Sequence, residues 1–189
     1  MDKLDLNTKA QELRERMGED VNSPVDIFSL ANQIDKLTIV YYPLGENISG
    51  MCVANEKVKL IAVNSTMSYG RQRFSLAHEF YHLYFDELSE FNVCSKKLDS
   101  TNEAEKNADQ FASYFLAPYK SLKALIKKIC GNEILSLHHI IALEQYFGMS
   151  HQAMLWRLVS EGYLTRRQLE EFSFGVMLTA RGLGYDDKL

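Results

Sequence analysis

One helical run with two histidines four residues apart constrains this chain more than any other stretch. Within residues 69–85, apolar and aromatic side chains recur every three or four positions, which predicts an amphipathic helix. His78 and His82 lie one turn apart on one face of that helix, and Glu79 stands beside the first of them. Two imidazole nitrogens so placed can bind one metal ion, with the glutamate near its open side as a base. The alternative is an ordinary helix with two buried, hydrogen-bonded histidines.

A catalytic zinc site needs a third protein ligand, and a second predicted helix over residues 102–117 offers one. Glu105 follows a connection long enough to bring this helix back antiparallel to the first. Asp109, one turn later, can accept the outer N–H of a ligand histidine and so fix the orientation of its ring. Glu103 competes for the ligand position but has no acid four residues on, which favours Glu105. The sequence therefore predicts a zinc ion held by His78, His82 and Glu105, with Asp109 behind them and Glu79 as general base.

The paired motifs "RFSLAHEFYH" and "EKNADQFASYFLAP" resemble those of the ImmA/IrrE family of metallopeptidases. The matching residues are Phe74, Ser75, Leu76, Ala77, His78, Glu79 and His82, then Glu105, Ala108, Asp109, Phe111, Ala112 and Pro118. Ala117 departs from the methionine that the family often has there, at a position that concerns side-chain packing. The resemblance implies a small gluzincin core that cleaves a protein substrate at a specific site. It further implies that the substrate is a helix-turn-helix transcriptional repressor in a stress response or on a mobile element.

The order of the predicted elements indicates an α+β fold. N-terminal helices over residues 3–17 and from Ser23 onward, with Pro24 in the first turn, precede three strands within residues 36–64. The last two strands form a hairpin about a turn near residues 55–57, so we expect a small, mostly antiparallel three-stranded sheet. The expected domains are a metallopeptidase core with its N-terminal helices (1–118), a helical helix-turn-helix-like subdomain (119–172) and a flexible C-terminal tail (173–189).

The segment "ALEQYFGMSHQAMLWRL" has the spacing of a helix-turn-helix, with a break at residues 148–150. A DNA-reading helix is expected to be basic, but this one offers only His151 and Arg157, in a chain whose formal net charge is −4. Glu144 also stands where such motifs prefer a small residue. These features disfavour direct DNA binding and favour a structural or protein-docking role.

The number and spacing of the cysteines indicate the cellular compartment and the type of metal site. Cys52, Cys94 and Cys130 are far apart and form no Cys-x-x-Cys pair, which argues against a thiolate zinc site and fits a reducing cytoplasm. No apolar run has membrane-spanning length. A side chain that stabilises the oxyanion could not be chosen by spacing among Tyr81, Tyr84, Tyr114, His138, His139 and His151. The alternative function is a partner-binding regulatory module or toxin–antitoxin component that acts without proteolysis; the intact Glu79 argues against it.

Overall fold

The sheet contains four strands in the order β1–β3–β2–β4, in a computed structural model that describes residues 1–54, 58–86, 92–95, 102–131 and 133–185. The strands are β1 (Leu37–Tyr42), β2 (Ile48–Ala54), β3 (Lys59–Asn64) and β4 (Asn92–Ser95). β2 pairs antiparallel with both β3 and β4, and β1 pairs parallel with β3. The predicted α+β fold, its hairpin and the mostly antiparallel sheet are confirmed.

The sheet has one strand more than the sequence predicts. β4 falls in a polar stretch that lacks the apolar alternation of a strand and was expected to be a connection. Its backbone nevertheless pairs with β2, Gly50 opposite Cys94 and Cys52 opposite Asn92. Such a short edge strand is defined by backbone hydrogen bonds to its neighbour, which a hydrophobic pattern does not reveal. The turn expected near residues 55–57 lies outside the described residues.

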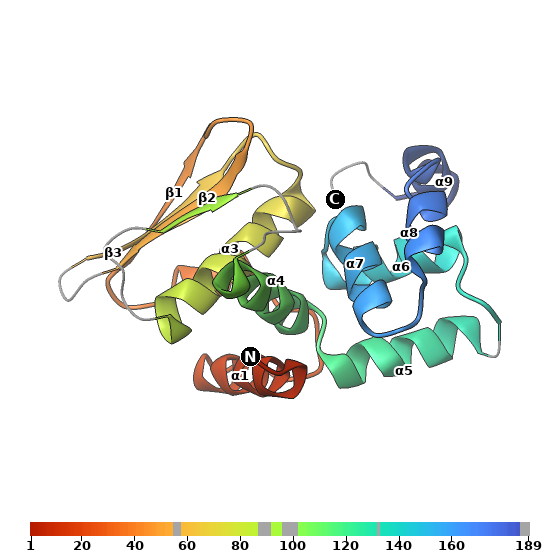
Figure 1. The fold of residues 1–189 in the computed structure, drawn as a ribbon, viewed down its shortest axis with the longest axis horizontal. Helices are drawn as coiled ribbons and strands as arrows, with labels where there is room; N and C mark the ends of the chain where they lie inside the picture. The colour runs from red at the N-terminus through yellow and green to blue at the C-terminus, as the bar shows by residue number, and fades with distance from the viewer. Residues whose placement is uncertain (55–57, 87–91, 96–101, 132, 186–189) are drawn as a thin grey trace.

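The helix that carries the two histidines, α3 (Tyr69–Phe85), lies along one face of this sheet (Figure 1). Its predicted bounds are confirmed, and the Ser68 hydroxyl caps it by accepting the Arg71 N–H at 3.3 Å. The second predicted helix, α4 (Glu103–Leu116), contacts α3, and α1 (Lys3–Arg16) covers the other side of α4. α3 contacts β3, and Ile61 and Val63 of that strand are fully buried. The metal-motif helices therefore sit in the middle of the core.

The second N-terminal helix, α2 (Ile27–Ala31), begins later than predicted. Its cap is Asp26, whose carboxylate accepts the Ser29 N–H and hydroxyl, rather than Ser23. The carbonyl of Ser23 instead accepts from the buried Arg14 guanidinium, and that of Val25 accepts from Arg73. These two arginines hold the carbonyls outside any helix, so the predicted start is wrong because of contacts from distant elements.

In the described part of the chain after α4 five further helices follow, and they lie to the right of the sheet in Figure 1. They are α5 (Tyr119–Cys130), α6 (Leu137–Phe147), α7 (His151–Ser160), α8 (Arg166–Phe172) and α9 (Val176–Gly182). α9 corrects the expected tail over residues 173–189, because it contacts α6 and buries Ala180. The expectation failed because most of the other apolar side chains of this short helix face outward. The division at residues 118 and 172 into separate domains stays a prediction.

The C-terminal helices dock closely on the start of α3. A Cβ on Gly70 would lie 2.6 Å from the backbone nitrogen of Ser150, so only glycine allows the turn between α6 and α7 to come this near. Arg73, one turn later, donates to the carbonyls of Gly148 at 2.8 Å and Phe147 at 3.4 Å. The turn of the helix-turn-helix-like segment is thus fastened to the helix that carries the metal motif.

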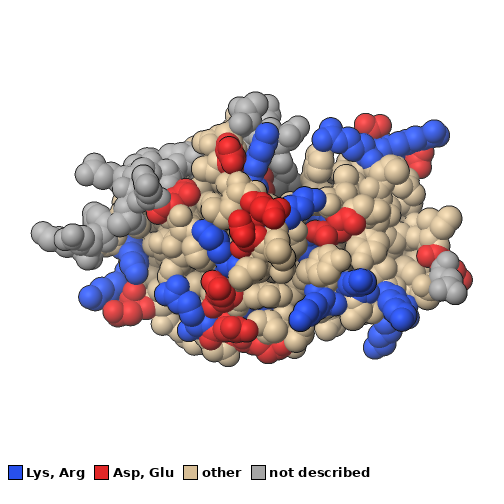
Figure 2. Space-filling view, turned by 60° about the horizontal axis from the view of Figure 1, so that its bottom comes forward, with Lys and Arg blue, Asp and Glu red and all other residues tan. Residues whose placement is uncertain are grey.

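The surface carries basic and acidic side chains side by side, with one local exception. In Figure 2 a group of blue side chains at the lower right lies over α5. The exposed lysines of this helix are Lys120, Lys123, Lys127 and Lys128. Within the part of the chain that the structure describes, no helix is both long and apolar enough to cross a membrane.

Candidate metal centre

The two histidines of α3 meet at one point in the interior. His78 and His82 are 5% and 4% exposed, and their ring centroids lie 4.9 Å apart. The two Nε2 atoms approach to 3.1 Å. This follows from the helix itself, since residues four apart lie one above the other on the same face. The predicted pair of imidazoles is therefore aimed at a shared position.

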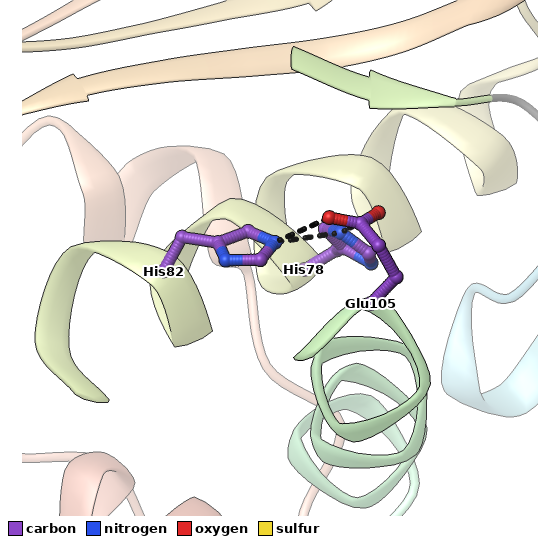
Figure 3. Close-up of side chains that lie close together, drawn as sticks. All are labelled: His78, His82 and Glu105. Carbon is purple, nitrogen blue, oxygen red and sulfur yellow. Dashed lines mark hydrogen bonds and ion pairs between the residues drawn. The ribbon is translucent and has the colours of Figure 1, made fainter. Parts of the chain in front are cut away.

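Glu105 completes a cluster of three candidate ligands. It lies in the first turn of α4, a helix capped by Asn102, whose side chain accepts the Ala104 N–H at 3.0 Å. Its two carboxylate oxygens each lie 3.4 Å from one histidine Nε2, and one ligand atom from each of the three residues falls within 4.8 Å of the others. Figure 3 shows the three side chains converging from two helices. The competing Glu103 is exposed instead and pairs with the Met1 amino group.

Carboxylates orient both imidazole rings from behind. The Nδ1 atom of His78 lies 2.8 Å from an Asp109 oxygen, as the sequence predicts, and that of His82 lies 2.5 Å from an oxygen of Asp86. A carboxylate accepts only, so each Nδ1 carries the hydrogen and each Nε2 presents its lone pair to the cluster. Asp86 was not among the predicted residues. Its position four residues after His82 was the available signal.

This arrangement fits a metal cation. Two Nε2 lone pairs and a carboxylate face one another at short range, an arrangement that is repulsive without a positive charge between them. Burial, and then the neighbouring His78, lower the pKa of His82. A proton on His82 is therefore disfavoured as the source of the positive charge that the cluster needs. Burial by itself would raise the pKa of Glu105, but with the histidines protonated the hydrogen bond and charge of His78 and the charge of His82 outweigh burial and leave that pKa lowered. Neutral imidazoles with a carboxylate are the donors that a catalytic zinc takes, with a fourth position left open.

Glu79, the candidate general base, is fully buried between α3 and β2. A Cβ on Gly50 of β2 would lie 2.6 Å from its Oε1 and 3.3 Å from its Cδ. The carboxylate therefore rests against the strand backbone in space that any larger residue would fill. Sequence reasoning missed Gly50, because nothing in a single strand reveals which side chain lies across from it.

Cys52, two residues further along β2, offers no competing ligand. Burial, followed by the negative charges of Glu79 and Asp86, raises the pKa of its thiol to about 12. The thiol therefore stays protonated near neutral pH, and a thiol with its proton is a poor metal ligand. This agrees with the absence of a Cys-x-x-Cys pair in the sequence.

Several side chains considered for oxyanion stabilisation are engaged elsewhere. The Tyr114 hydroxyl donates to Glu161 at 3.0 Å, and its ring lies under the Arg157 guanidinium. The Nδ1 of His139 accepts the Ser136 N–H in the capping box of α6. Tyr81 packs on the rings of Phe85 and Phe111, and its ring also lies edge-on to that of His82, with the centroids 5.8 Å apart. His151 contacts Glu144 and the Phe172 carbonyl, away from the cluster. The candidates that remain are Tyr81, Tyr84 and His138, and of these three Tyr81 contacts a residue of the cluster, through the ring of His82.

The helix-turn-helix-like segment does not present its second helix to solvent. Five of the ten residues of α7 are buried and four are half-buried, and Gln152 alone is exposed. Arg157, one of the two basic residues noted in the sequence, is 1% exposed and pairs internally with Glu161. A recognition helix must lay exposed side chains into a groove. Most of the surface of α7 is instead covered by contacts with α3, α4, α6 and α8.

Comparison with known proteins points in one direction. The sequence profile of Peptidase_M78, described as an IrrE N-terminal-like domain, matches residues 35–159. A solved transcriptional regulator from Mycobacterium tuberculosis is similar in fold, with a TM-score of 0.55 and 17% sequence identity. That match covers 82% of this chain and 47% of the regulator, so the chain spans about half of that protein's length. At this identity the likeness concerns the fold alone. None of the curated proteins matches the chain.

Proposed function

This chain belongs to the Peptidase_M78 family of IrrE N-terminal-like domains, and from that premise we propose that it is a zinc-dependent endopeptidase. The observation that carries the proposal is the convergence of His78, His82 and Glu105 beside a buried Glu79. A purely structural zinc site takes a fourth protein ligand and has no use for a general base. Among the described residues, the cluster contains three potential ligands.

The roles of the protein groups follow from their positions. When bound, zinc supplies Lewis acidity, which lowers the pKa of water and polarises a peptide carbonyl. Glu79 accepts a proton as the water oxygen attacks the carbonyl carbon, and returns it to the amine nitrogen as the C–N bond breaks. Asp109 and Asp86 hold the imidazole rings in one tautomer and orientation, so that both Nε2 lone pairs stay directed at the cluster.

The proposed substrate is a helix-turn-helix transcriptional repressor, cut at one site in the cytoplasm. Its support is the resemblance of the paired motifs to the ImmA/IrrE family. A transcriptional regulator of Mycobacterium tuberculosis with a similar fold is consistent with such a setting. Direct DNA contact is not part of the proposal, since the chain is acidic and α7 is largely buried. Retention on DNA that weakens steeply with salt would contradict this point.

Two measurements test the proposed function. Zinc per chain by elemental analysis should be near one for wild type and for Glu79→Gln, and much lower for Glu105→Ala. Incubation with a helix-turn-helix repressor from the same genome should give one cut, absent with Glu79→Gln. If the Glu79→Gln variant keeps zinc and still relieves repression in cells, the chain acts by binding its partner, and the endopeptidase proposal fails.

A further inference from the structure

A cavity between α4 and α7 lies directly behind the metal centre. Its volume is about 270 Å³, and its wall on the α7 side is formed by Ala153 and Trp156. Phe74 of α3 closes another side. None of the three candidate metal ligands lines this cavity, and it lies where the helix-turn-helix-like segment meets the core.

The cavity lies within a residue or a turn of the metal ligands. Lys106, on its rim, follows Glu105 directly, and Phe74 precedes His78 by one helical turn. Asp109 both lines the cavity and contacts His78 Nδ1 at 2.8 Å. A polypeptide whose carbonyl reaches the metal centre therefore passes close to this opening.

The polar groups of the cavity are occupied with one another. The Ser160 hydroxyl donates to the Gln110 side-chain oxygen at 3.0 Å, and the Gln110 amide donates to the Ser113 hydroxyl at 3.3 Å. Ser113 in turn donates to the Gln110 carbonyl at 2.8 Å. Arg157 is neutralised by Glu161 and donates to the Ala117 carbonyl. Of the buried polar side-chain atoms in this described lining, the Arg157 Nε lacks a hydrogen-bond partner. The rest of the lining is the apolar surface of Phe74, Ala153 and Trp156 with polar groups that are already bonded, so it favours an apolar occupant.

Charge at the rim adds a preference. Lys106 is exposed, and among the described residues no ion pair involves its ammonium group. A cationic side chain entering the cavity would pass this ammonium and lose its own hydration inside, while the Asp109 carboxylate in the lining is already hydrogen-bonded to His78. Size narrows the choice further, because 270 Å³ is just below the roughly 300–1,000 Å³ of sites for drug-sized ligands. The space suits one side chain rather than a cofactor.

We propose that the cavity between α4 and α7 receives an apolar side chain of the substrate next to the scissile bond. The inference rests on the proposed endopeptidase function and deepens it. It gives α7 a role as a wall of the substrate site, with Trp156 and Ala153 as residues that determine specificity. Binding is expected to be strengthened by leucine or phenylalanine at this substrate position and not by glycine, and lysine is not expected to enter the cavity.

Binding to this cavity can be followed without catalysis, because Trp156 is the only tryptophan of the chain. Zinc-loaded Glu79→Gln protein is titrated with blocked peptides Ala-Ala-X-Ala-Ala, where X is Gly, Leu, Phe, Asp or Lys. Leu and Phe should change the Trp156 emission at concentrations at least about tenfold lower than Gly, the order of discrimination that apolar pockets reach. An emission response that is the same for every X, or no response to any, overturns the proposal.

A variant that fills the cavity with a larger side chain is compared with a control variant on the same helix. In the Glu79→Gln background, Ala153→Phe should abolish the Leu and Phe response while zinc per chain stays unchanged. Gln152→Ala, at the neighbouring exposed position of α7, should leave the response intact. If Ala153→Phe loses helical circular dichroism, Trp156→Ala replaces it, with peptide binding then measured by calorimetry and expected to weaken for Leu and Phe alone. Unchanged discrimination in the folded variants overturns the proposal.

Cleavage distinguishes failure of this inference from failure of the proposed function. Cut sites in a peptide mixture are mapped for proteins that carry Glu79, as wild type and Ala153→Phe. Cuts beside Leu and Phe in wild type, lost with Ala153→Phe, support both proposals. If cleavage shows no preference for the neighbouring side chain and persists in Ala153→Phe, the proposed endopeptidase function stands and the proposed role of the cavity is overturned. A selective Trp156 response without cleavage of peptides or repressor by wild type overturns the endopeptidase, and with it the role of the cavity as a substrate subsite.

Discussion

Among the described residues, histidine meets carboxylate in two regions of the interior, and the two associations have opposite properties. On α3, His78 and His82 each give one ring nitrogen to a carboxylate and keep the other facing the cluster. Between α6 and α7, His151 uses both nitrogens. Its Nδ1 lies 2.7 Å from Glu144, and its Nε2 lies 2.9 Å from the Phe172 carbonyl. The first association leaves lone pairs for a metal ion, while the second leaves none.

The two glutamates differ in the same way. Burial acts to raise the pKa of Glu105, but with the histidines protonated the hydrogen bond and charge of His78 and the charge of His82 overcome burial and lower that pKa. For Glu144, burial outweighs the hydrogen bond and charge of His151, and the pKa is raised. One carboxylate is held as an anion ready for a cation, and the other shares a proton with a neighbour. A histidine beside an acid therefore indicates a metal site only where a second nitrogen and a third donor converge.

The largest difference between the two regions should appear in zinc binding. His82→Ala removes a nitrogen ligand, so we expect the affinity for zinc to fall by more than the about 10–100-fold that loss of an outer partner costs. His151→Ala should retain wild-type zinc, because neither of its nitrogens faces the cluster. Elemental analysis after dialysis against a weak chelator measures both. Equal retention of zinc in His82→Ala and His151→Ala would show that the two histidine regions do not differ in metal binding.

Next in size is the effect of crowding the general base. In Gly50→Ala the new Cβ would meet Glu79 Oε1, so the carboxylate must move. The rate of repressor cleavage should fall by up to about 10²–10⁴-fold, the usual contribution of general acid–base catalysis, with zinc retained. Gly45→Ala is the matched control, since a Cβ there meets nothing within 4 Å. If Gly50→Ala is as active as Gly45→Ala, strand β2 does not help to position Glu79.

A smaller effect is expected from the carboxylate behind the first histidine. Asp109→Ala leaves the His78 ring without its acceptor, and zinc affinity should weaken by about 10–100-fold. Competition with a chromogenic chelator gives the affinity. Glu103→Ala, on the same helix but paired with the chain amino group at the surface, should bind zinc as wild type does. Similar losses in both variants would point to a general weakening of α4.

The smallest effect concerns the association that binds no metal. The pKa of Glu144 is raised in the folded chain, so folding is favoured by its proton below the unfolded value of 4.5. That contribution disappears as pH rises through the folded pKa. Glu144→Gln keeps a neutral acceptor for His151 and cannot titrate. The unfolding free energy of wild type minus that of the variant should therefore decrease from pH 4.5 toward neutrality in urea titrations. A difference independent of pH would show that Glu144 titrates normally.

The sequence alone determined the parts of the site that lie within one helix. Turn spacing places His78 above His82, and it places Asp109 one turn after Glu105, whatever surrounds these helices. The choice of Glu105 over Glu103 was also predicted, because an acid at the right spacing is a local property. Asp86 was available by the same rule and was overlooked.

Tertiary structure alone decided what lies across from each helix. β4, the late start of α2, Gly50 beneath Glu79 and the wall that Trp156 gives to the cavity all depend on contacts between segments far apart in the chain. Helix geometry is fixed by hydrogen bonds four residues apart, so a short pattern suffices to reveal it. The position of one element against another is set by the fit of many side chains at once, and no single stretch of sequence records that fit.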